Sequence, residues 1–323
     1  MGYNQNENFI YYQYNPFDKE HPRKSQKMRE MGSLWSITKL AKFLDDKQYV
    51  QLGNKGFKYF EKTFKYDEEN DFLYVNITPE KIKLGYNAFM ILSLLDLEHP
   101  KKDYYMEKFA NGIMYQQQKD GSLKTFFYID RSTGVDYYPG EALVSMMSLY
   151  EHTKEEKYLA TVEKAFDYYT GYFEENPNTA FVPWQSRAYF KLYQQTKNQE
   201  VADFVYKMND YMIAQHNGQN NCSNFNFSRG ITTSVFMEGV NKAYDIAVEL
   251  GDEEKAKCYA NFIREGADFI IGLQISEADL AEKDLKLNAL GGFLGSANST
   301  SQRVDRNQHS VMALMEAHES ELL

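Results

Sequence analysis

GVDYYPGEALVSMMSLYEHT, residues 134–153, is the stretch that decides how the rest of the chain is interpreted. A polar and aromatic loop leads through Pro139 into an apolar segment. Proline is favoured in the first turn of a helix, where its missing N–H would have had no partner. Apolar side chains then recur at helical spacing, which predicts one buried helix face made of Leu143, Met146, Met147 and Tyr150.

The same pattern repeats along the chain. A polar break, TKEEK, separates the first helix from an outward helix at 158–172, so the unit is a loop, an inward helix, a tight turn and an outward helix. Further inward helices are predicted at 25–44, 84–97, 181–195, 232–250 and 304–319, with outward partners at 49–64, 104–118, 201–214 and 258–273. Related turns, FLDDKQY, YEHTKEEKY and VELGDEEKAKCY, support a helical repeat.

These repeats predict an all-α fold, an (α/α)6 barrel or toroid of helical hairpins, because several inward helices are too apolar to face an open groove. Residues 1–24 are predicted to be an irregular N-terminal segment and residues 25–323 a single toroid domain. Long loops precede the inward helices and therefore crowd one rim, where function is expected. One outward helix is lacking, so either residues 1–22 fill the gap or the natural chain extends upstream.

Composition excludes several classes of protein. A net charge of -10 without a cluster of Lys and Arg argues against nucleic-acid binding. No apolar run reaches the ~18 residues of a membrane span, and no signal peptide opens the chain. The expected location is cytoplasmic for the chain as given, or periplasmic or secreted if an N-terminal signal was removed. The oligomeric state stays open.

Cofactor motifs are lacking as well. Cys222 and Cys258 are too few for a disulfide framework or a Cys-rich zinc site. There is no HExxH, Walker or GxGxxG motif, and IDRSTGVD lacks the spacing of a calcium loop. We therefore expect no metal and no cofactor.

Five stretches of the chain resemble the bacterial (α/α)6-toroid proteins. They are KLGYNAFMILSLL, QQQKDGSL, YYPGEALVSMMSLYE, SVFMEGVNKAYDIA and RVDRNQHSVMALMEA. That assemblage includes glycoside hydrolases, sugar epimerases, uronyl epimerase domains, terpene cyclases and lanthionine cyclases. The resemblance is architectural, covers nearly the whole chain and implies a carbohydrate ligand. The zinc ligands of lanthionine cyclases and the DxDD acid of class II terpene cyclases are not matched.

Polar and aromatic residues stand at the starts of the inward helices, and in a ring they converge on one cavity. Aromatic platforms and hydrogen-bonding side chains are what a sugar site needs. The catalytic candidates are Glu141, Asp305, Glu238, Glu30 and His309. The substrate-binding candidates are Asp136, Tyr137, Tyr138, Trp184, Gln185, Arg187, Arg229, Tyr86, Arg303 and Gln308.

Structural roles compete with these assignments. Glu141 could cap its helix, and Asp305 with Gln308 could form a capping box. Burial would raise the pKa of Glu238, as a general acid requires, but an arginine partner would cancel that effect. Trp184 is either a core residue or a stacking platform.

The preferred function is a glycoside hydrolase acting on an oligo- or polysaccharide with paired carboxylates at the barrel mouth. A sugar or uronate epimerase, or a polysaccharide lyase, would use the same cavity. A non-catalytic helical binding scaffold is the third alternative.

Overall fold

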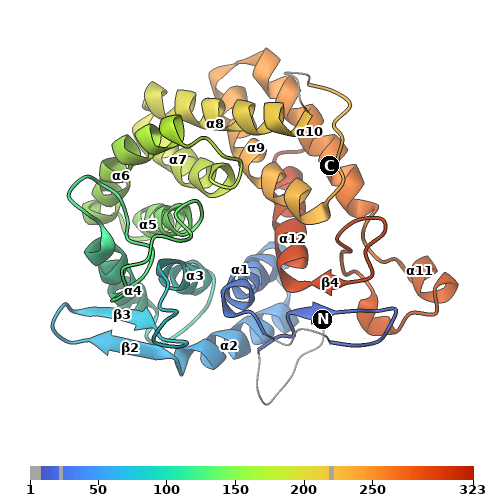
Figure 1. Ribbon diagram of the computed structural model, residues 1–323, viewed down its shortest axis with the longest axis horizontal. Coiled ribbons are helices and arrows are strands. Elements are labelled where there is room, and N and C mark those ends of the chain that lie inside the picture. Colours follow the sequence, from blue (N-terminus) through green and yellow to red (C-terminus); the bar gives the residue numbers. More distant parts are fainter. Residues whose placement is uncertain (1–8, 22–24, 218–221) are drawn as a thin grey trace.

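The computed structural model describes residues 9–21, 25–217 and 222–323. Six inner helices form a ring: α1 (Lys27–Leu44), α3 (Leu84–Leu95), α5 (Tyr138–Thr153), α7 (Val182–Thr196), α9 (Gly230–Leu250) and α12 (Val304–Glu319). Each contacts the next, and α12 contacts α1, so the ring is closed (Figure 1). The predicted all-α toroid is confirmed.

An outer layer covers most of the ring. It consists of α2 (Lys47–Glu61), α4 (Lys102–Gln116), α6 (Glu156–Glu175), α8 (Gln199–Asn217) and α10 (Glu253–Ile271). In four of the five short turns from inner to outer helices, all except the turn between α3 and α4, one residue adopts the left-handed conformation that ends a helix. These residues are Asp45, Lys154, Lys197 and Gly251, with φ of 50°, 61°, 51° and 69°.

The strands are short and peripheral. Between α2 and α3, β2 (Phe64–Asp67) and β3 (Phe72–Val75) form an antiparallel hairpin. In the N-terminal segment, β1 (Gln13–Tyr14) pairs with β4 (Gln302–Arg303), just before α12. The long loop before β4 holds α11 (Glu277–Glu282) and a 3-10 turn, η1 (Leu287–Ala289).

The two cysteines form a disulfide, which composition alone did not predict. Cys222, from the connection between α8 and α9, is bonded to Cys258 on α10, with a Cα–Cα distance of 4.8 Å. The bond fastens this connection to the outer layer.

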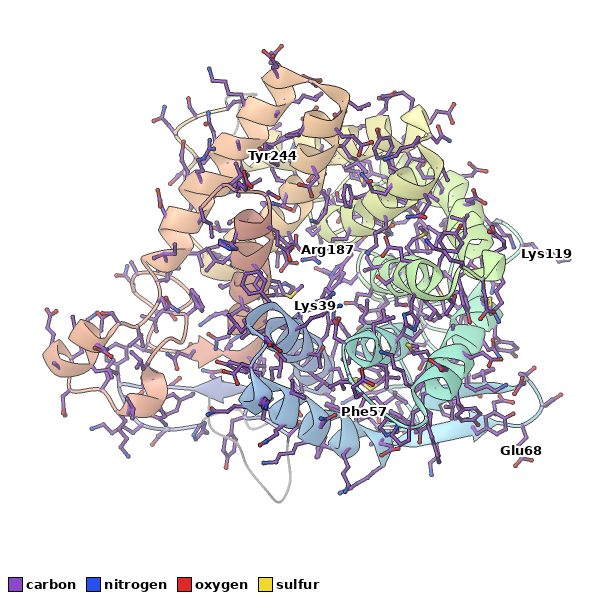
Figure 2. All side chains as sticks on the ribbon, turned by 180° about the vertical axis from the view of Figure 1, so that it is seen from behind. Lys39, Phe57, Glu68, Lys119, Arg187 and Tyr244 are labelled. Carbon is purple, nitrogen blue, oxygen red and sulfur yellow. A yellow bond between two sulfur atoms is a disulfide. The ribbon has the colours of Figure 1, made fainter. Side chains whose placement is uncertain are left out.

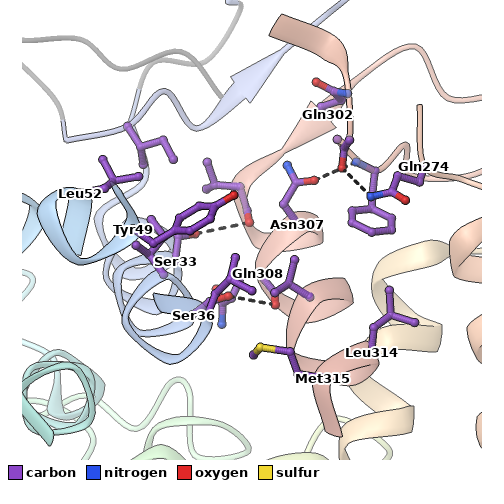
Figure 3. Close-up of a pocket in the computed structure, with 18 of the residues that line it drawn as sticks. Ser33, Ser36, Tyr49, Leu52, Gln274, Gln302, Asn307, Gln308, Leu314 and Met315 are labelled. Atoms are coloured by element: carbon purple, nitrogen blue, oxygen red, sulfur yellow. Dashed lines mark hydrogen bonds between the residues drawn. The ribbon is translucent and has the colours of Figure 1, made fainter. Parts of the chain in front are cut away.

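Among the described residues, no outer helix covers the place between α12 and α1. A cavity of about 670 Å³ lies there, with Ile37, Leu40, Val311 and Leu314 in its wall (Figure 3). Phe9 and Ile10 line it from the N-terminal segment. Across it, Asn307 accepts a hydrogen bond from the Phe293 N–H at 2.8 Å, which holds the loop to α12.

Candidate functional site

The first turns of the six inner helices form one end of the ring, which we call the mouth. Four of the five connections that lead to it are long, as expected. The fifth, residues 176–181 between α6 and α7, is short, so α7 enters the ring almost directly from the outer layer.

Glu141 lies in the first turn of α5 and is only 5% exposed. It does not cap the helix through a side-chain hydrogen bond, because α5 has no such cap and its buried Oε2 has no hydrogen-bond partner among the described residues. Burial raises the pKa of Glu141 to about 8, and the charge of Lys83 offsets only part of that effect. Its carboxyl group therefore carries a proton at neutral pH.

The surroundings of Glu141 keep it in place. Its Oε2 lies directly against Gly85 of α3, where no β-carbon would fit. Lys83, two residues before that glycine, places its Nζ 5.2 Å from the ring centre of Tyr138 and 5.8 Å from that of Tyr86. Burial lowers the pKa of Lys83 although Glu141 acts to raise it, so burial outweighs the attraction between the two groups.

Asp305 lies in the first turn of α12, which is opposite α5 in the ring. The predicted capping box is wrong, because α12 begins without a side-chain cap and Asp305 instead binds two arginines. Arg303 donates from Nε to Oδ1 at 2.9 Å, and Arg29 of α1 pairs with Oδ2. Burial alone would raise the pKa of Asp305, but the Arg303 hydrogen bond and the Arg29 charge outweigh it and hold the pKa below its ordinary value.

Tyr12 also lies at the mouth, although it was not predicted as a site residue. Its ring lies 5.9 Å from the guanidinium carbon of Arg29 and 5.4 Å from that of Arg303, within cation–π range. No local pattern could place residue 12 there, since the β1–β4 pairing brings it to the mouth.

One level deeper, a charged chain crosses the ring. His309 Nδ1 lies 3.0 Å from Glu238 Oε1, and Glu238 Oε2 lies 3.2 Å from Arg187 Nη2. Arg187 also pairs with Glu316 at 2.7 Å. Glu238 thus has an arginine partner, which argues against its use as a general acid. Its contact with His309 engages Nδ1 of that histidine and leaves the other ring nitrogen to face a ligand.

An aromatic cluster fills the ring beside this chain. Trp184 packs against Trp35 and Phe89, with ring centres 5.7 Å apart in both pairs, and its ring centre lies 6.5 Å from that of His309. Trp184 is 5% exposed, so it is packed in this structure. Trp35, the second tryptophan, was not among the residues predicted for the site.

Several predicted residues lie elsewhere. Glu30 is a capping residue of α1, since it accepts hydrogen bonds from Ser25 Oγ at 2.6 Å and the Gln26 N–H at 2.9 Å. Gln308 does not face the mouth but packs against Gly32 and lines the outer cavity. Asp136 accepts a hydrogen bond from the Tyr172 hydroxyl of α6 at 2.9 Å.

The remaining candidates differ in exposure. Tyr137 is 46% exposed at the start of α5, and Arg229 is exposed at the start of α9. Gln185 is fully buried, and neither atom of its amide has a hydrogen-bond partner within the described ranges. Tyr86 is buried beside Lys83, and burial raises its pKa.

Within the ranges that the structure describes, no group of three or more His, Cys, Asp or Glu side chains is arranged to hold a metal ion. None of the helices described is long and apolar enough to cross a membrane.

No protein-family profile and no curated protein matches the chain. Solved structures do match. An α-1,6-mannanase of glycoside hydrolase family 76 from Salegentibacter sp. is 12% identical, with a TM-score of 0.65 over 94% of this chain and 91% of that one. Cellobiose 2-epimerase from Bacillus thermoamylovorans is 12% identical, with a TM-score of 0.62 over 97% and 93%. A D-mannose isomerase is 10% identical, with a TM-score of 0.66 over 96% and 91%. The chain therefore shares the (α/α)6-toroid fold of these proteins.

Proposed function

We propose that the chain is a carbohydrate-active enzyme of the glycoside hydrolase type, with its reaction at the mouth. One observation carries the proposal: Glu141 and Asp305, on opposite inner helices, have pKa values displaced in opposite directions. A glycosidase needs one protonated and one ionised carboxyl group, and environments that separate two pKa values assign those roles.

In this mechanism Glu141 gives its proton to the glycosidic oxygen as the bond to the sugar breaks. Asp305 keeps a negative charge, which stabilises the positive charge that develops on the sugar ring. Water then adds to the anomeric carbon, and the ionised Glu141 takes up the proton that this water releases. Arg29 and Arg303 reduce the basicity of Asp305, so it acts mainly through its charge. The exposed ring of Tyr137 offers a face on which a pyranose can stack.

The structural neighbours support a carbohydrate as the ligand. They include a mannanase, an epimerase of cellobiose and an isomerase of mannose, and one mannanase variant was solved with α-1,6-mannotriose. These names suggest the first substrates to test on this chain: α-1,6-manno-oligosaccharides, cellobiose and D-mannose.

The test is turnover of that panel by the wild type, Glu141→Gln and Asp305→Asn. Loss of a general acid typically lowers the rate by about 10²–10⁴-fold, and we expect such a loss for Glu141→Gln. Glu249→Gln is the matched control, because Glu249 is paired with Lys197 at 2.6 Å on the surface. Full turnover by Glu141→Gln would refute the acid role.

A second function, epimerisation or isomerisation, is favoured by the bond between His309 and Glu238. A histidine held in this way is suited to move a proton at the carbon beside a carbonyl. Incubation with D-mannose or cellobiose in D2O would then put deuterium into the sugar, and His309→Asn would abolish the exchange. If the panel yields neither hydrolysis nor exchange, the binding-scaffold alternative replaces both.

We also propose that the protein works in an oxidising compartment, such as the periplasm or the cell exterior. The Cys222–Cys258 disulfide supports this location, because such bonds are rare in reducing cytosol. Alkylation of cell fractions with a thiol reagent before reduction tests it. Two free thiols in the native protein would contradict the proposal.

A further inference from the structure

The ring has a polar cavity at the end opposite the mouth, which we call the back chamber. Its volume is about 440 Å³, within the ~300–1,000 Å³ typical of small-molecule sites. All six inner helices contribute to its wall, and Figure 2 shows Lys39 and Arg187 in the opening that they enclose. Trp35 belongs to the aromatic cluster beneath the mouth and also lines the chamber.

Charged groups of both signs alternate around the chamber. Asp96 lies 3.3 Å from Lys39 and 3.2 Å from Lys42. On α7, Lys191 follows Arg187 by one helical turn and pairs with Glu151 of α5. Donors and acceptors therefore stand side by side, without a large excess of either charge among the lining residues.

One of these groups lacks a partner although it is buried. Within the described part of the chain, Arg187 Nε is a buried donor without a hydrogen-bond partner, whereas Glu316 Oε2 forms no hydrogen bond but lies 3.5 Å from Lys242 Nζ as an ion pair. Arg187 is 6% exposed and Glu316 is 8% exposed, and both line the chamber. Buried polar atoms normally have hydrogen-bond partners, so the free donor of Arg187 points to a ligand.

Lysines crowd the chamber as well. Burial lowers the pKa of Lys191, Glu151 opposes this, and the charges of Lys39 and Lys242 lower it further. A hydroxyl group of a ligand could accept a hydrogen bond from one of these ammonium groups and donate its own proton to a neighbouring carboxylate. Such hydroxyl groups would give hydrogen-bond partners to the lysines and to the carboxylates. A hydroxyl can donate and accept at once, which neither a simple anion nor a simple cation can do.

We propose that the back chamber is a second binding site for a neutral sugar of one or two hexose units, separate from the mouth. Apolar faces are present for it, since Phe43, Phe190 and Trp35 line the chamber among the charged groups. The entrance is formed by the exposed residues Lys42, His152 and Glu319. This site does not depend on the reaction proposed at the mouth.

Calorimetric titration with D-mannose and with cellobiose tests the proposal, using Glu141→Gln protein so that turnover does not interfere. We expect Ser148→Phe, which fills the chamber from α5, to abolish one binding event. Lys191→Met should weaken that event about tenfold or more, as the loss of a charge-assisted hydrogen bond does. Lys197→Met is the matched control, because Lys197 follows α7 at the same end of the ring but does not line the chamber.

Circular dichroism and thermal melting establish that each variant is folded. Unchanged titrations of both Ser148→Phe and Lys191→Met would overturn the proposal. D-Glucuronate or D-glucosamine binding in the chamber in place of the neutral sugars would also overturn it. Asp305→Asn changes only the mouth. We expect it to leave sugar binding in the back chamber intact, whether or not the mouth is catalytic.

Discussion

The buried acid at the mouth should make the stability of the protein depend on pH in a defined way. The pKa of Glu141 rises from its ordinary 4.5 to about 8 in the folded chain. The folded state then holds a proton that the unfolded state releases, so the free energy of unfolding falls as pH rises. This contribution is fully present below pH 4.5 and is lost as pH rises through 8.

The magnitude follows from the displacement of the pKa. Each pKa unit is worth about 1.36 kcal/mol, so the loss is about 1 kcal/mol at pH 5, about 3 at pH 7 and about 5 at pH 9. Glu141→Gln keeps the shape of the side chain and removes its titration. The wild type should therefore lose about 4 kcal/mol relative to this variant between pH 5 and pH 9.

Urea unfolding of both proteins at pH 5, 7 and 9 measures this difference. Lys83 is present in both chains, so its own titration largely cancels in the comparison. If the two proteins show parallel dependence on pH, the carboxyl group of Glu141 is not held protonated by burial. The assignment of Glu141 as the acid would then fail even if the variant were inactive.

Three further predictions concern single positions. Gly85→Ala should lower the free energy of unfolding by about 1–3 kcal/mol, because the new methyl group would meet the carboxyl group of Glu141. Gly171→Ala is the control in the same urea assay and should cost nothing, since no atom lies within 4 Å of the new methyl group. Asp305→Asn should lower the free energy of unfolding by about 3–5 kcal/mol at pH 7, because it leaves two arginines without their partner. This difference from the wild type should disappear as pH falls through the low folded pKa of Asp305, and acid titration followed by circular dichroism measures it. Cys222→Ser should lower the free energy of unfolding by about 3–4 kcal/mol, since the disulfide spans 36 residues, and dithiothreitol should bring the wild type to the same value.

The helices could be predicted from the sequence because their apolar residues recur at helical spacing. The inward helix expected at 84–97 is Leu84–Leu95, and the one expected at 232–250 is Gly230–Leu250. Their ends were harder to predict. Gly251 is a recognisable helix-ending residue, but Asp45 adopts the same left-handed conformation without a glycine to signal it.

The orientation of side chains at the mouth could not be predicted from position in a helix. Gln308 and His309 are neighbours in the sequence, yet His309 turns to Glu238 inside the ring while Gln308 packs against Gly32 of α1. Consecutive helical residues point about 100° apart, and only the packing of the ring decides which of them faces inward.

Long-range partners were also beyond the sequence. Asp305 looked like a helix cap because an acid near a helix start usually is one, and its actual partner, Arg29, is 276 residues away. The bond between Cys222 and Cys258 likewise depends on the connection before α9 crossing to α10. Such contacts follow from the closure of the ring, which a local pattern does not describe.

The charged chain across the ring is a costly way to fill an interior. Desolvation offsets most of the attraction in a buried ion pair, so an apolar filling would stabilise the ring at least as well. Arg187 contacts Glu238, the partner of His309, and Glu316 in the wall of the back chamber, while its guanidinium lies 5.4 Å from the ring centre of Trp35. One side chain thus fixes groups that face both ends of the ring. Charges held in this way need no reorganisation when a ligand arrives, and positioning them explains the network better than stability does.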